Sequence, residues 1–328
     1  MIKSIIYGVC MVCGLYACST TKKSQNSQQA AVGIEFSADS AWLFCQEQCN
    51  FGPRTMNSKA HEQCSQWIQQ KFAQYGYQVE LQQADLKGYD GTLLRSTNII
   101  ASKPSTLTNR IFICAHWDSR PWADNDPDSS NWHKPVMAAN DGASGVAVML
   151  ELARLLHEND SAQIAVDFIC FDAEDWGVPQ WSDEVNSDSW ALGSQHWAAN
   201  YRQLNPKPHY DYAILLDMVG GQGAKFYQEQ FSMKHARKVV EKVWQAASAA
   251  GYGSIFPAKG GIAVTDDHLP VNEEAHIPCI DIINHYPDYE QSSFGPTWHT
   301  VNDDMQHIDR NTLKAVGQTL VQLLYSEQ

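Results

Sequence analysis

The stretch "ICFDAEDWG" at residues 169–177 places three acids directly after an apolar run. Asp172, Glu174 and Asp175 would repel one another and lose hydration at the end of a buried strand, which costs free energy unless a cation or shared protons compensate. A zinc ion bound by Asp175, with Glu174 beside it as a free carboxylate that moves protons, would explain this crowding. The sequence therefore predicts a metal site at this strand end.

Four other places supply a histidine or an acid directly after an apolar run, at the start of an expected helix or late in the chain. Catalytic zinc prefers a few such ligands and keeps one open position. Any one of these residues alone is more often structural, for example a helix N-cap or a hydrogen-bonded core histidine. Their joint occurrence favours a metal site. The candidates are His116 and Asp118 in "AHWDSR", Asp141 in "AANDGASG", Asp217 after "AILL", and His299 in "TWHT".

Apolar runs of strand length precede most of these residues, and segments with helical spacing lie between them. Strands that alternate with helices predict an α/β fold, a three-layer sandwich in which helices flank a largely parallel mixed central sheet. Such sheets gather functional groups at the carboxyl ends of their strands. No repeat marks a second domain, so one catalytic domain is expected over residues 37–328. We expect strands at 77–86, 110–115, 164–171, 212–216 and 278–283, and helices at 58–75, 146–157 and 311–325.

The composition suits a folded protein that does not bind nucleic acid. Of the 328 residues, 44% are apolar, which is enough for a proper core. The formal net charge is −14, whereas phosphate binding requires a basic face. The spacing of the cysteines gives no paired zinc motif. We expect Cys45, Cys49 and Cys64 nearer the surface, and a disulfide among these three is possible but is not established by the sequence.

The N-terminal segment predicts export. Lys3 precedes the apolar stretch "SIIYGVCMVCGLYAC", which has the length of a signal peptide and is short for a membrane span. Its end, "LYAC", resembles the lipobox of bacterial lipoproteins, which implies a signal peptide at 1–17 and lipid attachment at Cys18. Small polar residues then predict a flexible tether at 18–36. We expect a periplasmic protein held at a bacterial membrane by its lipid alone; an uncleaved membrane anchor is the alternative.

Six strings occur in a specific order: "AHWDSR", "NDGASGVAVMLELAR", "FDAEDW", "LLDMVG", "DDHLP" and "FGPTWHT". This order resembles the zinc aminopeptidases with co-catalytic metals and, within that superfamily, more closely the glutaminyl cyclases, which convert N-terminal glutamine to pyroglutamate. The resemblance implies a zinc exopeptidase-like fold and substrates that are peptides or proteins with N-terminal glutamine. By position, it implies zinc ligands Asp141, Asp175 and His299, the general base and acid Glu174, and the hydrogen-bonding acids Asp217 and Asp266.

Aromatic residues distinguish the possible functions. Cyclisation needs a curled glutamine side chain and little water, which a small aromatic box supplies, and Trp181, Phe294 and Trp298 match the positions of such a box. Three ligands and an open position predict one zinc ion per chain. We also expect the protein to be a monomer. A zinc aminopeptidase is the alternative, in which His116 and Asp217 complete a second zinc site and Asp141 bridges. A third reading is a lipoprotein that binds peptide or carbohydrate through its Trp-rich loops.

Overall fold

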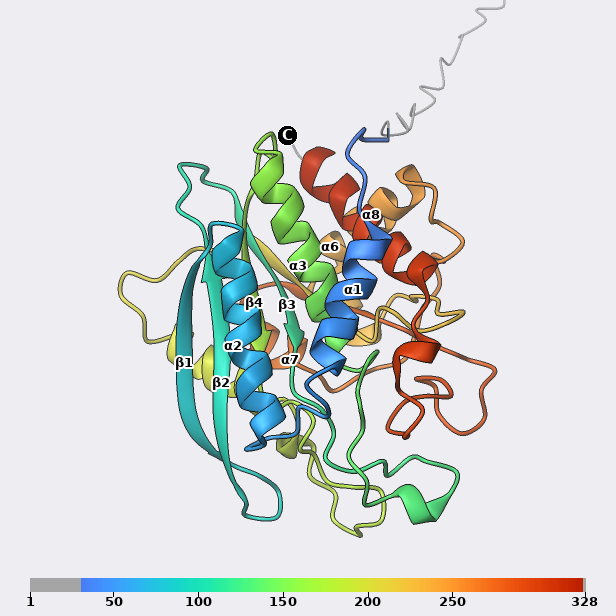
Figure 1. Cartoon of the computed structure of the whole chain (residues 1–328). Coiled ribbons are helices and arrows are strands. Elements are labelled where there is room, and N and C mark those ends of the chain that lie inside the picture. The colour runs from blue at the N-terminus through green and yellow to red at the C-terminus, as the bar shows by residue number, and fades with distance from the viewer. Residues whose placement is uncertain (1–30, 327–328) are drawn as a thin grey trace, which may run out of the picture.

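One mixed β-sheet forms the centre of the molecule. The computed structural model describes residues 31–326, and within them six strands lie in the order β1-β2-β4-β3-β5-β6 (Figure 1). β2 runs antiparallel to both neighbours, whereas β4, β3, β5 and β6 are parallel to one another. The expected largely parallel mixed sheet is therefore confirmed. The strands are β1 (Gln78–Lys87), β2 (Leu93–Ser102), β3 (Arg110–His116), β4 (Ala165–Phe171), β5 (Tyr212–Asp217) and β6 (Cys279–Ile283).

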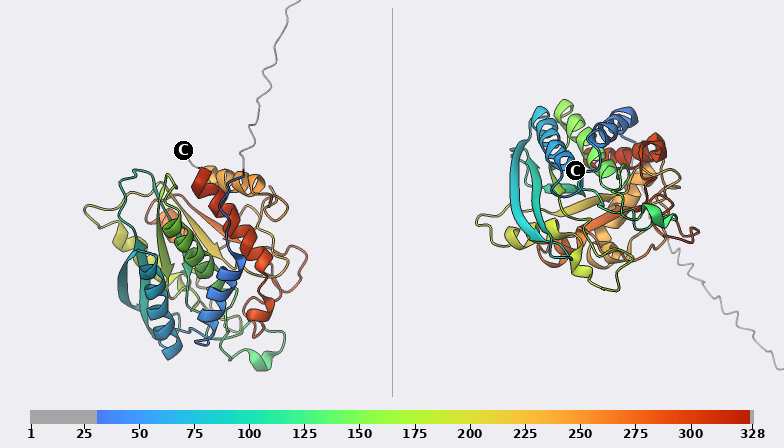
Figure 2. Two further views of the ribbon diagram at one scale, coloured as in Figure 1. Left: turned by 45° about the horizontal axis from the view of Figure 1, so that its top comes forward. Right: turned by 60° about the horizontal axis from the view of Figure 1, so that its bottom comes forward.

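Helices cover both faces of this sheet and complete the three expected layers (Figure 2). The larger layer holds the long helices that pack on one another and on one face, and a smaller pair covers the other face. A short helix, α5 (Gln230–His235), lies beside β6. The larger layer consists of α1 (Ala38–Cys49), α2 (Lys59–Gln74), α3 (Ala143–Glu158), α6 (Arg237–Ala249) and α8 (Arg310–Ser326), and the smaller of α4 (Leu192–Tyr201) and α7 (His268–Glu273).

The central strands alternate their side chains between the two helical layers. In β3, Ile111 and Ile113 join the core under the larger layer, whereas Phe112 and Cys114 join the core under α4 and α7. All four side chains are fully buried. A strand that is buried on both faces has an unbroken run of apolar residues. For this reason, the central strands could be predicted from the sequence within a residue or two of their observed ends.

Two elements near the N-terminus were not predicted. β2 has the sequence "LLRSTNIIAS", in which polar residues interrupt the apolar ones. Ser96 and Asn98 are nevertheless buried, and Asn98 Nδ2 donates a hydrogen bond of 2.8 Å to the backbone oxygen of Gly193. α1 was missed because its sequence contains several acids and amides, and one of these amides, Gln48, is buried with the apolar residues and with Cys49. The apolar spacing is therefore incomplete.

The first described residues, 31–36, fall in the segment expected to be a tether, and they pack against α8. The Val32 amide donates a 2.9 Å hydrogen bond to Gln322 Oε1 near the end of α8. Phe36 is buried, and its ring lies so close to Gly317 that a Cβ at that position would collide with it. The predicted signal peptide at 1–17 and the lipid site Cys18 lie outside the described residues.

The expectation that three cysteines lie near the surface was wrong. Cys45, Cys49 and Cys64 are all buried, and they are free thiols, as are the other cysteines in the described part of the chain. Between residues 31 and 326, no helix combines the length and apolar character needed to span a bilayer.

The parallel strands direct their carboxyl ends to the lower end of the molecule in Figure 1, where long loops follow them. Figure 2 (right) turns this end toward the viewer. The described chain begins at the opposite end, beside the last turn of α8. The fold therefore brings together the acids and histidines that the sequence places after separate strands.

Candidate active site

Sharp backbone turns follow the central strands. Ala173 after β4, Met218 after β5, and His299 in the late loop have φ values of 53°, 49° and 53°. This left-handed conformation costs a residue with a side chain about 1–2 kcal/mol. Such residues cluster at functional sites, where the surrounding structure holds them in place. The turns at Ala173 and Met218 adjoin the acids that end their strands.

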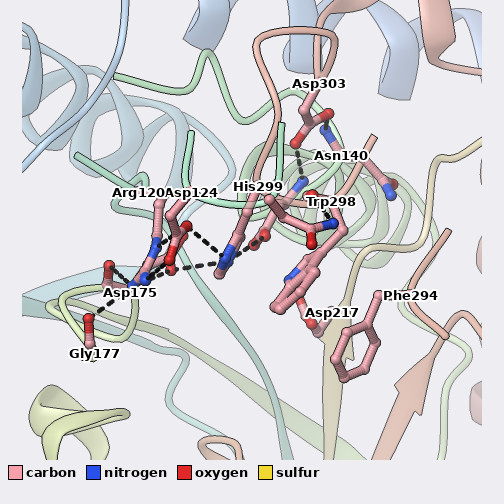
Figure 3. A network of polar contacts seen from close by, with 12 residues as sticks. Arg120, Asp124, Asn140, Asp175, Gly177, Asp217, Phe294, Trp298, His299 and Asp303 are labelled. Carbon is pink, nitrogen blue, oxygen red and sulfur yellow. Dashed lines mark hydrogen bonds and ion pairs between the residues drawn. The ribbon is translucent and has the colours of Figure 1, made fainter. Parts of the chain in front are cut away.

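Three of the predicted ligands come together in one buried group. Asp141, Asp175 and His299 each offer a donor atom, and these atoms lie within 4.8 Å of one another. His299 Nε2 lies 3.2 Å from Asp175 Oδ1 and 3.6 Å from Asp141 Oδ2 (Figure 3). Both carboxylate oxygens of Asp175 are buried and accept no hydrogen bond. Two carboxylates and one imidazole nitrogen that converge in this way, with both Asp175 oxygens unpartnered, fit a divalent cation such as zinc.

A second group shares Asp141. His116 Nε2 lies 2.9 Å from Asp141 Oδ1 and 3.3 Å from Asp217 Oδ1. All three side chains are buried, and neither ring nitrogen of His116 has a hydrogen-bond partner. Asp141 thus contributes one oxygen to each group, and the arrangement contains the donors for two neighbouring metal positions.

A buried ion pair fixes the orientation of His299. Its Nδ1 lies 3.3 Å from Asp124 Oδ1, and Arg120 Nη2 donates to Asp124 Oδ2 at 2.6 Å (Figure 3). Burial alone would raise the pKa of Asp124. The hydrogen bonds and charges of His299 and Arg120 have the larger combined effect, and they hold the pKa of this carboxyl well below its usual range. A carboxylate on the far nitrogen of a ligand histidine fixes its tautomer and its direction.

Two further carboxylates hold backbone segments in place. Asp303 accepts hydrogen bonds from the backbone amides of Asn140 and Asp141, at 2.7 and 3.0 Å. Asp118 accepts from the amides of Glu174 and Asp175, both at 3.2 Å. Asp118 was a candidate ligand, but it belongs to none of the donor groups among the described residues and positions the ligand loop instead.

Glu174 projects into a pocket of about 260 Å³ together with Asp217 and Asp266. Burial is the main cause that raises the pKa of all three carboxyls, and the increase is large for Glu174 and Asp266. Burial likewise raises the pKa of Asp175 to about 6. A carboxyl whose pKa is raised toward neutral pH is suited to general acid and base catalysis.

Aromatic rings form much of the rest of the pocket wall. Trp298 stacks on His299, with ring centroids 3.9 Å apart, and Phe294 lies 4.9 Å from Trp298. Trp190 lines the pocket and stacks on His299 at 5.9 Å. Figure 3 shows the Trp298 and Phe294 rings beside Asp217. The pocket thus has a metal-binding floor and largely apolar walls.

The structure does not bring Trp181 into this pocket. Its ring packs against Trp122 and Trp132 at 5.8 and 6.2 Å, and 37% of the side chain is exposed. Trp190 lines the pocket instead. Both tryptophans lie in the loop after β4, and the sequence gives no local signal that separates them. Asp124, Asp303 and Arg120 were also missed, because their roles depend on contacts with distant segments.

A third buried group lies behind the pocket. Asp266, His268 and Asp281 offer donor atoms within 4.8 Å of one another, and Asp281 accepts no side-chain hydrogen bond. His268 Nε2 lies 3.3 Å from Glu229 Oε2. Burial raises the pKa of Asp281 well above its usual value.

The fold and the paired donor groups define an α/β metallohydrolase-like protein of the zinc exopeptidase class. The sequence matches peptidase family M28 over residues 98–324, and the chain belongs to that family. The structure is similar to that of a glutaminyl cyclase from Bacteroides thetaiotaomicron, with 46% identity, a TM-score of 0.86, and coverage of 90% of this chain and 99% of that one.

Two other relatives are described as aminopeptidases. A solved structure of a leucine aminopeptidase precursor from the same Bacteroides species is 45% identical, with a TM-score of 0.85, and the match covers 91% of this chain and all of that one. The aminopeptidase YwaD of Bacillus subtilis is 28% identical over 254 residues, which are 75% of this chain. The chain spans about half the length, 48%, of this curated relative.

Proposed function

We propose that this protein is a zinc-dependent glutaminyl cyclase, which converts the N-terminal glutamine of peptides and proteins to pyroglutamate and releases ammonia. The observation that carries the proposal is the small pocket in which the aromatic rings of Trp190, Phe294 and Trp298 stand over a buried donor group. The similarity to the Bacteroides glutaminyl cyclase along nearly its whole chain supports it.

Asp141, Asp175 and His299 hold the zinc ion in this proposal, because their donor atoms converge and Asp175 has no hydrogen-bond partner for either oxygen. When bound, the zinc ion supplies Lewis-acid polarisation of the γ-carboxamide oxygen of the substrate. Asp124 and Asp303 position the donors, through the ring of His299 and the backbone amide of Asp141.

Glu174 moves the protons of the reaction. It accepts a proton from the α-amine as the nitrogen forms its bond to the carbonyl carbon (Cδ) of the side-chain carboxamide, and it returns a proton to the amide nitrogen as the bond between Cδ and that nitrogen breaks and ammonia leaves. Its raised pKa suits a group that must hold a proton between these two steps. Asp217 and Asp266 share the pocket with it and hold the proton path.

The aromatic walls favour cyclisation over hydrolysis. A pocket of about 260 Å³ bounded by Trp190, Phe294 and Trp298 confines the glutamine side chain, so that its amine stays close to its own γ-carbonyl. The reaction uses no water as nucleophile, and an apolar wall excludes water from the reacting atoms.

A zinc aminopeptidase is the second candidate, because His116, Asp141 and Asp217 form a complete second donor group. One assay separates the possibilities: the purified protein is offered a glutaminyl peptide and a leucyl peptide. Ammonia without peptide cleavage identifies a cyclase, and free leucine identifies an aminopeptidase. Tight binding of peptide without turnover of either substrate identifies a binding protein.

We expect about one tightly held zinc ion per chain, since Asp141, Asp175 and His299 with one open position satisfy a catalytic zinc site. Metal analysis of the protein after exhaustive dialysis measures this ratio. Two firmly held ions, both required for activity, would contradict the single-zinc proposal and favour the aminopeptidase.

We also propose that the protein is exported, acylated at Cys18 and anchored by this lipid at a bacterial membrane, where it acts as a monomer. The Cys18→Ser variant is then expected to lose fatty-acid label and membrane retention, because the thiol carries the lipid. Membrane fractionation after labelling with a fatty acid tests this. Equal labelling of the variant and the wild type would exclude attachment at Cys18.

A further inference from the structure

Five aromatic side chains meet beside the pocket; one of them, Trp181, is exposed, and the other four are half-buried. Tyr89 comes from the β1–β2 hairpin, Trp122 and Trp132 from the loop after β3, and Trp176 and Trp181 from the loop after β4. We call these five residues the aromatic surface. Trp122 lies at its centre, with ring centroids 5.7 Å from Tyr89, 5.3 Å from Trp176 and 5.8 Å from Trp181. Clustered aromatic rings that are partly open to solvent favour a binding site, whereas scattered single rings need no explanation.

Arg120 joins this surface to the pocket. Its guanidinium carbon lies 4.6 Å from the ring centroid of Trp190, which lines the pocket, and 5.1 Å from that of Trp122. The side chain is 1% exposed and donates to Asp124 and to the backbone oxygens of Asp175 and Gly177. The two tryptophan rings are therefore at most about 10 Å apart and are held by a fully bonded, buried cation.

Glycines set the positions of two of the rings. A Cβ at Gly177 would collide with Trp190, and a Cβ at Gly88 would collide with Trp176, so both indoles lie directly on backbone. Trp176 Nε1 also donates to Asp90 Oδ1 at 3.3 Å. Preorganised rings lose little conformational entropy when a ligand binds.

Acidic side chains lie at two places beside the aromatic surface, on which Arg120 and the ring of His133 also pack. Asp90 lies beside Trp176, and Asp183 and Glu184 follow Trp181 closely in the same exposed loop. Burial first, and then the charges of Asp90 and Glu184 among others, raise the pKa of Tyr89, which places both acids near this ring. Electron-rich indole faces flanked by carboxylates attract arginine and lysine side chains as well as aromatic ones.

We propose that the aromatic surface binds the third and fourth residues of a peptide substrate and prefers arginine, lysine or aromatic side chains there. This inference rests on the proposed glutaminyl cyclase function. The pocket accommodates one terminal side chain, and in this proposal the chain beyond it leaves past Trp190, one of the lining residues. An extended peptide advances about 3.3 Å per residue, and about three residues therefore cover the distance from Trp190 to Trp122.

The test compares kcat/KM for two peptide amides, Gln-Ala-Ala-Ala and Gln-Ala-Phe-Arg, in wild-type protein and in the Trp181→Ala variant. We expect the wild type to prefer the second peptide and the ratio of the two kcat/KM values to fall at least about fivefold in the variant. Trp42→Ala is the matched control: Trp42 is a half-buried tryptophan of α1 that packs on Arg310, and its loss is expected to leave the ratio unchanged.

An unchanged ratio in Trp181→Ala, or an equal loss for both peptides, overturns the proposal, since a merely structural role would affect both substrates alike. Thermal unfolding of each variant confirms that it is folded. If the wild type turns over neither peptide, the proposed cyclase function fails instead. Calorimetric titration of Gln-Ala-Phe-Arg amide against the wild type and Trp181→Ala then decides the peptide site separately: at least fivefold weaker binding by the variant supports it, and equal binding overturns it.

Discussion

The Glu174→Gln variant is expected to lose at least about 100-fold in kcat for a glutaminyl peptide, while its zinc content stays that of the wild type. The amide keeps the size of the glutamate but cannot accept the proton of the α-amine. Glu174 lines the pocket and lies outside the donor group Asp141, Asp175 and His299, so metal binding does not depend on it. Ammonia release and zinc content measured on the same sample check both parts.

Turnover near the wild-type rate would show that Glu174 does not move the proton. Loss of zinc from Glu174→Gln would instead show that this carboxyl is a ligand. Added zinc is not expected to restore activity at any concentration, because the lost function is proton transfer.

The Asp175→Ala variant is expected to lose nearly all activity for a different reason. Removal of a ligand carboxylate leaves Asp141 and His299 as the remaining donors of the group, and the affinity for zinc falls. Activity should therefore return at least in part when zinc is added in excess. A zinc titration followed by ammonia release measures this recovery.

Asp288→Ala serves as the control, because Asp288 is an exposed acid in the loop after β6 and lies outside the pocket and the donor groups. It should retain both zinc and activity. If Asp175→Ala kept its zinc at the wild-type affinity, or if excess zinc restored nothing in an otherwise folded variant, Asp175 would not be a ligand.

The sheet was predictable because its central strands are buried on both faces. Such a strand has a continuous apolar sequence, as in "RIFICAH" of β3, and no distant contact is needed to recognise it. β2 could not be recognised, since Asn98 is buried through a side-chain hydrogen bond to Gly193, 95 residues further along the chain. Buried polar groups of this kind depend on tertiary partners that the local sequence does not reveal.

The same distinction applies to the site. The donor groups were predictable because their residues follow parallel strands, whose carboxyl ends meet. Two rings of the pocket wall, Phe294 and Trp298, were also predicted. The third was not, because Gly177 and the buried Arg120 place Trp190 there while Trp181 packs on Trp122. Asp303 lies more than 160 residues from the Asn140 amide that it holds, and no spacing rule connects them.

The described chain begins beside the last turn of α8, at the end of the molecule opposite to the pocket (Figure 1). This position affects how the pocket is oriented when the protein is attached to a support. A bead or a fusion partner joined directly at residue 31 would lie at the end of the molecule opposite to the pocket. Under the proposed function, folded proteins with an N-terminal glutamine would then reach the pocket from the side away from the support. We expect immobilisation at this end of the molecule to leave the pocket open, and attachment through the loops after β3 or β4 to obstruct it.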